Sequence, residues 1–204
     1  IALTAFKLAL KDNDPSQIVK AHTISTTASK QINLDMARNV THDMNNGCSK
    51  FSCICMYTTE DGTKTISRIL SYWPEFPMYS DTVYRGIFIE EESLAHYAVG
   101  KRIISTTFIS TSPDIRIADV FGAYNRRAQE LEKLEEGKAS FLSIYTIKNY
   151  NGRRTAINIS QVSQFPDEGE VLILPYSEFV IKNITIKHLT RGKRIEIELE
   201  ELAD

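Results

Sequence analysis

The stretch Ser163-Gln-Phe-Pro-Asp-Glu-Gly-Glu-Val-Leu-Ile-Leu-Pro175 joins a polar turn that contains Pro166 to an apolar strand at residues 171–174. Two carboxylates, Glu168 and Glu170, stand where the turn runs into the strand. Residues two apart in an extended chain project to the same face, so both acids can face one site. Taken alone, the stretch is open to two interpretations: solvated acids at the end of a strand, or a catalytic pair.

The apolar pattern of the rest of the chain predicts an α+β fold, with a helical N-terminal third followed by an antiparallel β core. In residues 1–75, Asp14 followed by Pro15 is a typical helix start, and apolar residues recur at helical spacing. We expect one domain over residues 1–204, with a helical part at 1–75 and a β core at 76–204. Strands are predicted at residues 82–89, 103–109, 139–147, 155–159, 171–174, 179–186 and 195–199.

Local motifs predict what joins these strands. Ser112-Pro113 is a strong helix start, and apolar spacing continues the helix over residues 115–124. The mixed-charge residues 126–138 are expected to form a solvated helix or loop. Asn151-Gly152 is the strongest short hairpin signal in the sequence, so we expect its two flanking strands to pair.

Composition excludes several classes of function. The net charge of −2 gives no electrostatic reason to bind nucleic acid or an acidic membrane surface. No apolar run approaches the roughly 18 residues of a membrane span, and the chain carries no Gly-x-Gly-x-x-Gly motif, Walker loop or Gly-x-Ser-x-Gly elbow. The chain begins with Ile1 rather than Met, so we expect a processed product or a fragment of a longer protein.

The cysteines give little support for a metal site or a disulfide framework. All of them, Cys48, Cys53 and Cys55, fall within one short segment, and the four histidines are scattered along the chain. A zinc site needs a second pair of ligands, so we expect free thiols and no bound metal.

Two further motifs lie, like the two glutamates, at strand ends. Tyr84-Arg85-Gly86 lies on a strand, and Ser110-Thr111-Ser112 stands at a strand-to-helix junction. Individually each has an ordinary explanation, a surface arginine and a helix cap. Together, and in this order, the motifs closely resemble the mono-ADP-ribosyltransferases of the arginine–serine–glutamate class, which includes vertebrate ecto-enzymes and binary or C3-like toxins.

The resemblance runs from about Tyr57 to Phe179. It implies a two-sheet β core with an NAD cleft, and NAD as the ADP-ribose donor. It is carried by three blocks: Thr82-Val-Tyr-Arg-Gly; Phe108-Ile-Ser-Thr-Ser with a helix ending near Phe121-Gly122; and Ile159-Ser-x-x-Ser-x-Phe-Pro-x-Glu-x-Glu-Val-Leu-x-Leu-Pro.

The chemistry of NAD cleavage explains why such a site needs these residue types. The nicotinamide–ribose bond breaks through an oxocarbenium-like transition state, and the leaving group departs neutral, so no general acid is required. A single carboxylate can stabilise the developing charge, a role that the resemblance gives to Glu170. Glu168 would orient and deprotonate a guanidinium acceptor. Arg85 would bind the pyrophosphate or ribose, and Ser110 would fix Glu170.

The resemblance also implies a set of residues around NAD. Gly86 lacks a Cβ, so its backbone can approach the nicotinamide amide. Phe121 matches an aromatic that packs on nicotinamide, with core packing as an equal alternative. Tyr57 and Ser163 match positions that line the cleft, and Phe165 lies in the turn that the family uses to recognise its target.

The chain departs from the ecto-enzymes in two places. Thr107 stands where they often have Gln, and their disulfide-forming cysteines have no clear match here. The second departure favours an intracellular or delivered effector over a secreted ecto-enzyme.

Three functions are consistent with this sequence. The first is transfer of ADP-ribose from NAD to arginine on a protein partner, since the first acid of Glu-x-Glu accompanies guanidino acceptors in the family. The second is NAD glycohydrolysis, with water as the acceptor at the same site. The third is a non-catalytic interaction module that kept the fold.

Overall fold

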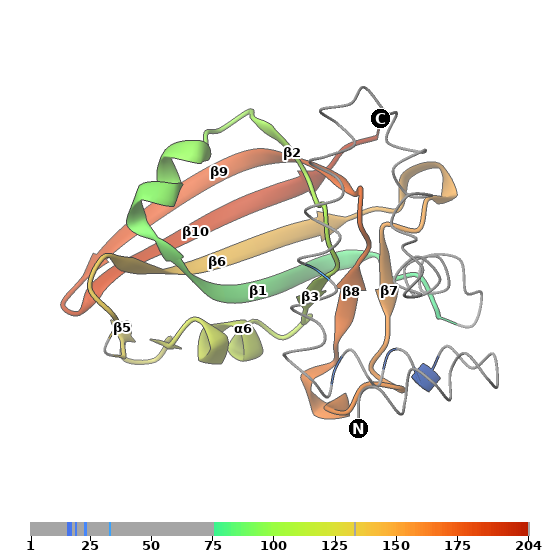
Figure 1. Ribbon diagram of the computed structural model, residues 1–204, viewed down its shortest axis with the longest axis horizontal. Helices are drawn as coiled ribbons and strands as arrows, with labels where there is room; N and C mark the ends of the chain where they lie inside the picture. The colour runs from blue at the N-terminus through green and yellow to red at the C-terminus, as the bar shows by residue number, and fades with distance from the viewer. Residues whose placement is uncertain are drawn as a thin grey trace.

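The structure, a computed structural model, describes residues 76–132 and 134–203, together with Ser16, Gln17, Val19, Thr23 and Asn33. Among the described residues, β-strands are the predominant regular element (Figure 1). The elements in chain order are β1 (Asp81–Glu90), η1 (Glu91–His96), β2 (Arg102–Ile104), β3 (Ile109–Thr111), α6 (Ile115–Phe121), β4 (Tyr124–Asn125), β5 (Glu130–Leu131), β6 (Lys138–Ile147), η2 (Tyr150–Gly152), β7 (Ala156–Asn158), η3 (Pro166–Glu168), β8 (Val171–Ile173), β9 (Glu178–Leu189) and β10 (Gly192–Glu201).

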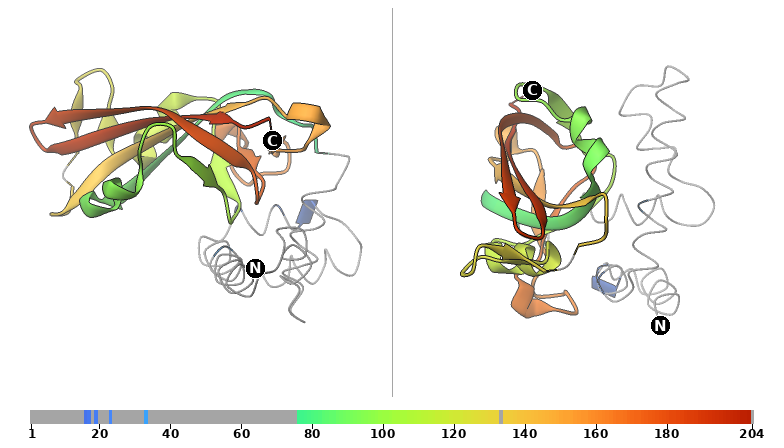
Figure 2. Two further views of the ribbon diagram at one scale, coloured as in Figure 1. Left: turned by 90° about the horizontal axis from the view of Figure 1, so that it is seen from above. Right: turned by 90° about the vertical axis from the view of Figure 1, so that its left-hand side faces the viewer.

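The larger sheet has the strand order β1-β6-β10-β9-β2. Successive side chains along each strand project to opposite faces of the sheet. One face builds the core, and α6 partly covers the other. Val83 on β1, Tyr145 on β6 and Ile197 on β10 belong to the core face and are nearly or completely buried. In the left view of Figure 2 the long β9–β10 hairpin reaches the end of the molecule opposite β7 and β8.

A smaller sheet with the order β3-β8-β7 stands across one end of the larger sheet (Figure 1). Tyr84 on β1 and Ser112, just after β3, form an isolated antiparallel bridge that joins the two sheets. Val171 and Ile173 on β8 pack into the same core as the buried residues of the larger sheet. The smaller sheet therefore holds the end of β8 close to the edge of β1.

The helix α6 packs directly on β1, and a glycine permits the close approach. A Cβ built on Gly86 would lie 1.7 Å from the carbonyl oxygen of Ala118 in α6. Since no side chain tolerates such a distance, this position requires glycine. The β4–β5 hairpin follows α6 immediately.

The predicted α+β class, with its helical N-terminal third and antiparallel core, is wrong. Within residues 76–132 and 134–203 the fold is mostly β-sheet, with α6 as its only α-helix. β10 pairs with β6 in parallel, so the sheet is mixed rather than antiparallel. No helical N-terminal third is among the described residues, and apart from the five residues given above, 1–75 lies outside them. The two-part division of the domain stays a prediction.

The prediction that the strands flanking Asn151-Gly152 pair as a hairpin is also wrong. β6 and β7 belong to different sheets, although a turn does separate them. Asn151 and Gly152 have positive φ, and the Arg153 N–H donates to the Tyr150 carbonyl oxygen at 3.0 Å, so the tight turn itself forms, but at a corner between two sheets. The corner sends β7 into the smaller sheet.

Two other local predictions need new boundaries. The single strand predicted at 103–109 is two strands in different sheets, β2 and β3, because the chain passes from one sheet to the other around Ser105. The helix predicted at 115–124 ends at Phe121, and its N-cap is Asp114, whose side chain accepts a hydrogen bond from the Arg116 N–H. Residues 126–138 contain a short strand, β5, rather than only a solvated helix or loop.

The strands predicted at 82–89, 139–147, 179–186 and 195–199 are confirmed as parts of β1, β6, β9 and β10. No helix in the described part of the chain is long and apolar enough to cross a membrane.

Candidate active site

The candidate site opens at the free edge of β1, where β1 and β3 separate. Tyr84 exchanges two backbone hydrogen bonds with Ser112, at 2.8 and 2.9 Å between nitrogen and oxygen. Backbone groups of alternate residues in a strand point to the same side, so those of Gly86 also point away from β6 and toward this edge. Beyond the bridge, the edge of β1 therefore offers backbone donors and acceptors to a ligand.

The three hydroxyls of Ser110-Thr111-Ser112 each bind the segment that carries the two glutamates. The Ser110 hydroxyl donates to Glu170 Oε1 at 2.6 Å. The Thr111 hydroxyl donates to the Val171 carbonyl oxygen at 2.6 Å, and the Ser112 hydroxyl to the Glu168 carbonyl oxygen at 2.6 Å. This motif thus fixes the glutamate segment against β3, and the Ser112 hydroxyl also accepts from the Asp114 N–H at the start of α6.

The Glu170 side chain is buried and held by two hydroxyls. Its residue is 7% exposed. Besides Ser110 on Oε1, the Ser163 hydroxyl donates to Oε2 at 3.0 Å, and it accepts in turn from the Phe165 N–H. Both oxygens of the carboxylate are therefore oriented by neutral donors, and neither carries an ion pair among the described residues. The Glu170 carboxylate lines the cavity described below.

Glu168 reaches the same cavity by a different backbone route from the one expected. It ends η3, and Gly169 follows with φ +58°, so the two glutamates are not neighbours on one extended strand. A side chain on Gly169 would be strained by this φ and would also meet the Pro113 ring at 3.4 Å. Burial and the nearby Glu170 charge raise the pKa of Glu168 above its ordinary value.

Arg85 lies on the core face of β1 and is held by backbone and aromatic neighbours. Its Nη1 donates to the Ser110 carbonyl oxygen at 2.7 Å. Burial lowers the pKa of the guanidinium, and the neighbouring Tyr145 and Glu170 oppose that shift. Ser143 is the cross-strand partner of Arg85, and Tyr145 lies diagonally from it on the same face. The guanidinium thus stands within the electrostatic reach of Glu170, on the same wall.

These groups surround a cavity of about 340 Å³. Its size suits part of a dinucleotide or a small ligand. Six residues predicted from sequence line it: Arg85, Gly86, Ser110, Phe121, Glu168 and Glu170.

The other predicted residues lie behind the cavity or outside the described residues. Ser163 touches Glu170 from behind and does not line the cavity. Phe121 is 55% exposed, which excludes the alternative of core packing for this ring. Phe165 is 51% exposed in the turn before η3. Tyr57 lies outside the described residues.

Sequence reasoning missed four residues that shape the site. Ile87 on β1 and Ile117 and Ala118 on α6 line the cavity, and Tyr145 lies beside Arg85. Helical spacing could have placed Ile117 on the same face as Phe121, since the two are four residues apart. Nothing local marks Tyr145, because its place depends on the register between β1 and β6.

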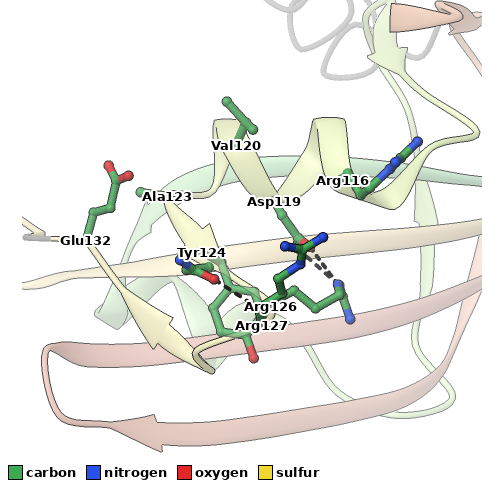
Figure 3. Close-up of a pocket in the computed structure, with 9 residues that line it drawn as sticks. Arg116, Asp119, Val120, Ala123, Tyr124, Arg126, Arg127 and Glu132 are labelled. Carbon is green, nitrogen blue, oxygen red and sulfur yellow. Dashed lines mark hydrogen bonds and ion pairs between the residues drawn. The ribbon is translucent and has the colours of Figure 1, made fainter.

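A larger hollow of about 510 Å³ lies between α6 and the β4–β5 hairpin (Figure 3). Its walls include Arg116, Asp119, Arg126 and Glu132, and it shares no lining residue with the cavity at Glu170. Size therefore does not identify the reactive site. The smaller cavity gathers the two glutamates, the serine and the arginine, and we take it as the candidate active site.

The donor set of the cavity suits stabilisation of positive charge rather than nucleophilic attack by a protein side chain. A carboxylate oriented by hydroxyls stabilises a developing cation, and a guanidinium binds phosphate or ribose oxygens. In the described part of the chain, no group of three or more histidines, cysteines and acids is placed to hold a metal ion.

The sequence matches no protein-family model and no curated protein sequence. Solved structures do match the fold. The C3 exoenzyme from Clostridium limosum has a TM-score of 0.59 and 15% identity, over 99% of this chain and 95% of that chain. Exoenzyme S from Pseudomonas aeruginosa, solved with human 14-3-3 protein beta and bound to carba-NAD, has a TM-score of 0.56 and 14% identity, over 93% and 74%.

The ADP-ribosyltransferase Vis from Vibrio splendidus has a TM-score of 0.51 and 18% identity, over 97% of this chain and 85% of that chain. At such identities the likeness concerns the fold. The chain has the fold of the mono-ADP-ribosyltransferases, which confirms the resemblance found in the sequence at the level of fold.

Proposed function

We propose that this chain is an NAD-dependent mono-ADP-ribosyltransferase that modifies arginine side chains on proteins and releases nicotinamide. One observation carries the proposal: a buried carboxylate, Glu170, is oriented by the Ser110 and Ser163 hydroxyls on the wall of a cavity that also holds Arg85. The fold supports it, and so does the carba-NAD bound to exoenzyme S, a protein of the same fold.

NAD would occupy the cavity with its nicotinamide end at the β1 edge. The backbone of Gly86 would bind the amide, and the Phe121 ring would pack on the nicotinamide face. Arg85 would bind the pyrophosphate or ribose. Each of these groups lines the cavity, and Arg85 is also fixed in place through its bond to the Ser110 carbonyl.

Cleavage would then proceed by departure of a neutral leaving group. The bond between ribose C1′ and the nicotinamide nitrogen breaks, and its electron pair leaves with nicotinamide. Glu170 stabilises the oxocarbenium ion that develops at C1′. No proton transfer is needed in this step, which agrees with a carboxylate held by donors rather than by an acid partner.

Glu168 would act on the acceptor. A guanidinium nitrogen forms the new bond to C1′, and the proton that it loses passes to the Glu168 carboxylate. The raised pKa of Glu168 suits a proton acceptor, because a more basic carboxylate accepts a proton more readily. Glu168 lines the cavity and follows the exposed Phe165 in the same turn, which supports a role toward an incoming protein.

The alternative is an NAD glycohydrolase, in which water takes the place of the guanidine. Glu168 distinguishes the two, since hydrolysis has no need of a base selected for a guanidinium. A non-catalytic module is less favoured, because all three motifs are kept and converge on one cavity.

The test uses the whole chain with NAD labelled in its ADP-ribose half and either agmatine or polyarginine as the acceptor. Arginine transfer predicts label on the acceptor together with released nicotinamide. Nicotinamide and free ADP-ribose in equal amounts, without labelled acceptor, would identify the glycohydrolase. No heat on titration with NAD and no nicotinamide release would contradict both enzymes.

A further inference from the structure

Arg194 on β10 is a fully buried arginine that plays no part in the chemistry above. Its residue is 0% exposed. Its Nη2 donates to Asp119 Oδ1 on α6 at 2.7 Å, and its Nε donates to Glu196 Oε1 at 2.9 Å. A buried charge is tolerated only when it is paired and hydrogen-bonded, and these two carboxylates meet that need.

Asp119 is shared between two arginines. Arg126, just after β4, donates from Nε to Asp119 Oδ2 at 2.6 Å, and Figure 3 shows the two side chains facing each other. The ring of Tyr124 lies 3.9 Å from the Arg194 guanidinium carbon, measured to the ring centroid. The carboxylate of α6 is thus bonded to the sheet on one side and to the following hairpin on the other.

A second tie reaches the C-terminal end of α6. The Ser140 hydroxyl on β6 donates to the Gly122 carbonyl oxygen at 2.6 Å. The same hydroxyl oxygen accepts a hydrogen bond from Arg194 Nη1 at 3.4 Å. Arg194 and Ser140 are cross-strand partners in the parallel β6–β10 pair. One buried guanidinium therefore supports both a side chain of α6 and the cap of the same helix.

The opposite side of α6 forms the wall of the candidate active site. Residues two apart in an α-helix are separated by about 200° around its axis, so Ile117 and Phe121 point away from Asp119. Both line the cavity at Glu170, whereas Asp119 lines the hollow on the other side. A change in how Asp119 is held would rotate or shift the helix and move Phe121 relative to Gly86.

We infer that Asp119 and Arg194 are positioning residues that hold α6 at the distance from β1 which NAD requires. This inference rests on the proposed function. The buried pair sets the wall formed by Ile117 and Phe121, and it acts through α6 without touching NAD. Buried ion pairs are weak contributors to stability but can select one arrangement over others, which suits a wall that must be placed accurately.

The experiment compares three variants of the whole chain in NAD cleavage, thermal unfolding and hydrogen exchange. Arg194→Met removes the guanidinium. Asp119→Leu combined with Arg194→Met replaces the pair by apolar side chains, which often restores stability. Lys187→Met is the control, because Lys187 on β9 pairs with Glu196 at 2.8 Å, so it removes a different cation from the same carboxylate.

We expect Arg194→Met to raise KM for NAD about tenfold with kcat within about threefold, since binding is lost equally in the ground and transition states. Amide exchange in α6 should accelerate. The double variant should recover the thermal midpoint but not KM, and Lys187→Met should match the wild type in KM. If Arg194→Met does not fold, Arg194→Lys, which keeps the charge and loses the fork, should raise KM by about threefold.

Recovery of KM together with stability in the double variant would show a merely structural pair and overturn the inference, as would unchanged α6 exchange in an active Arg194→Met protein. Wild-type protein that neither binds nor cleaves NAD would instead overturn the proposed function, and the NAD-positioning role with it. The two failures are therefore distinguishable by the behaviour of the wild type.

Discussion

Two buried glutamates, Glu170 before β8 and Glu201 at the end of β10, are held in different ways. Glu201 is 2% exposed, and its Oε2 accepts from the backbone N–H groups of Lys148 and Asn149 at 2.6 and 2.8 Å. Its other oxygen accepts from the Thr155 hydroxyl. This carboxylate fixes the corner between β6 and β7, where the chain changes sheets.

Glu170 has a similar burial, but its two donors are the hydroxyls of Ser110 and Ser163, and it lines a cavity. At Glu201 the carboxylate accepts from backbone N–H groups and so holds the chain between β6 and β7 in place. Side-chain hydroxyls at Glu170 orient a carboxylate that lines the cavity. Burial by itself does not separate a structural acid from a reactive one. A hydroxyl donor is common to both acids, so the cavity at Glu170 and the backbone donors of Glu201 separate them.

The strongest test of this contrast is Glu170→Gln. We expect NAD cleavage to fall about a thousandfold, as when a preorganised electrostatic group is lost. The thermal midpoint should stay within a few degrees of the wild type, because the amide oxygen can still accept from Ser110. Nicotinamide release and a thermal melt measure the two effects. Full NAD turnover in this variant would show that Glu170 is not the catalytic carboxylate.

Glu168→Gln separates the two glutamates of the turn. Transfer to agmatine should fall about a hundredfold, the usual contribution of a general base, while NAD hydrolysis stays within about threefold of the wild type. Product analysis with labelled NAD gives both rates in one experiment. Asp167→Asn, a neighbour in η3 that does not line the cavity, is the matched control and should keep both activities. Equal loss of transfer and hydrolysis in Glu168→Gln would remove its separate role.

Glu201→Gln should act in the opposite sense. The amide places an N–H₂ group among donors, and we expect a loss of about 1–3 kcal/mol in the free energy of unfolding. The turnover of NAD per folded molecule should be unchanged. Denaturant titration alongside nicotinamide release tests this. A variant that keeps its stability but loses turnover would reverse the roles assigned to the two acids.

Ser163→Ala tests the donor behind Glu170 with a smaller effect. Loss of one hydrogen bond to a charged group is worth about 1.5–3 kcal/mol, of which we expect part to appear as a roughly tenfold lower kcat. Ser160→Ala is the comparison, because the Ser160 hydroxyl bonds to Asn158 instead of Glu170. Equal kcat in the two variants would indicate that Ser110 alone orients Glu170.

The smallest expected effect is a shift in the pH dependence of transfer to agmatine, caused by Glu168. Its pKa is raised, so the acidic limb of agmatine transfer should have its midpoint above 4.5, the ordinary value, and Glu168→Gln should lack that limb. The contribution of Glu168 to folding stability has the opposite pH dependence to its contribution to transfer. A raised pKa favours the protonated form in the folded protein, so this stability is fully present below pH 4.5 and declines as pH rises through the folded pKa. Thermal melts of wild type and Glu168→Gln across that range measure the difference.

The sequence located most of the site because its chemistry lies in short motifs. Arg85, Ser110 and Glu170 each stand in a motif of a few residues, and the structure brings all three to one cavity. The expectation that Glu168 and Glu170 share one face of an extended strand was wrong in detail, because Gly169 turns the chain instead of extending it. Asp119 and Arg194 could not have been found, since 75 residues separate two groups whose pairing no local pattern marks.

The sequence by itself determined the long strands β1, β6, β9 and β10, since alternation of apolar and polar residues is a local property of each segment. It also determined which hydroxyls and carboxylates were available for chemistry. Only the tertiary structure decided that β10 pairs in parallel with β6, that the Asn151-Gly152 turn leads to another sheet, and that the edge of β1 stays open at Gly86. The physical reason is that sheet order and register depend on contacts between distant segments, whose closure is governed by the whole chain and not by the pattern of any one strand.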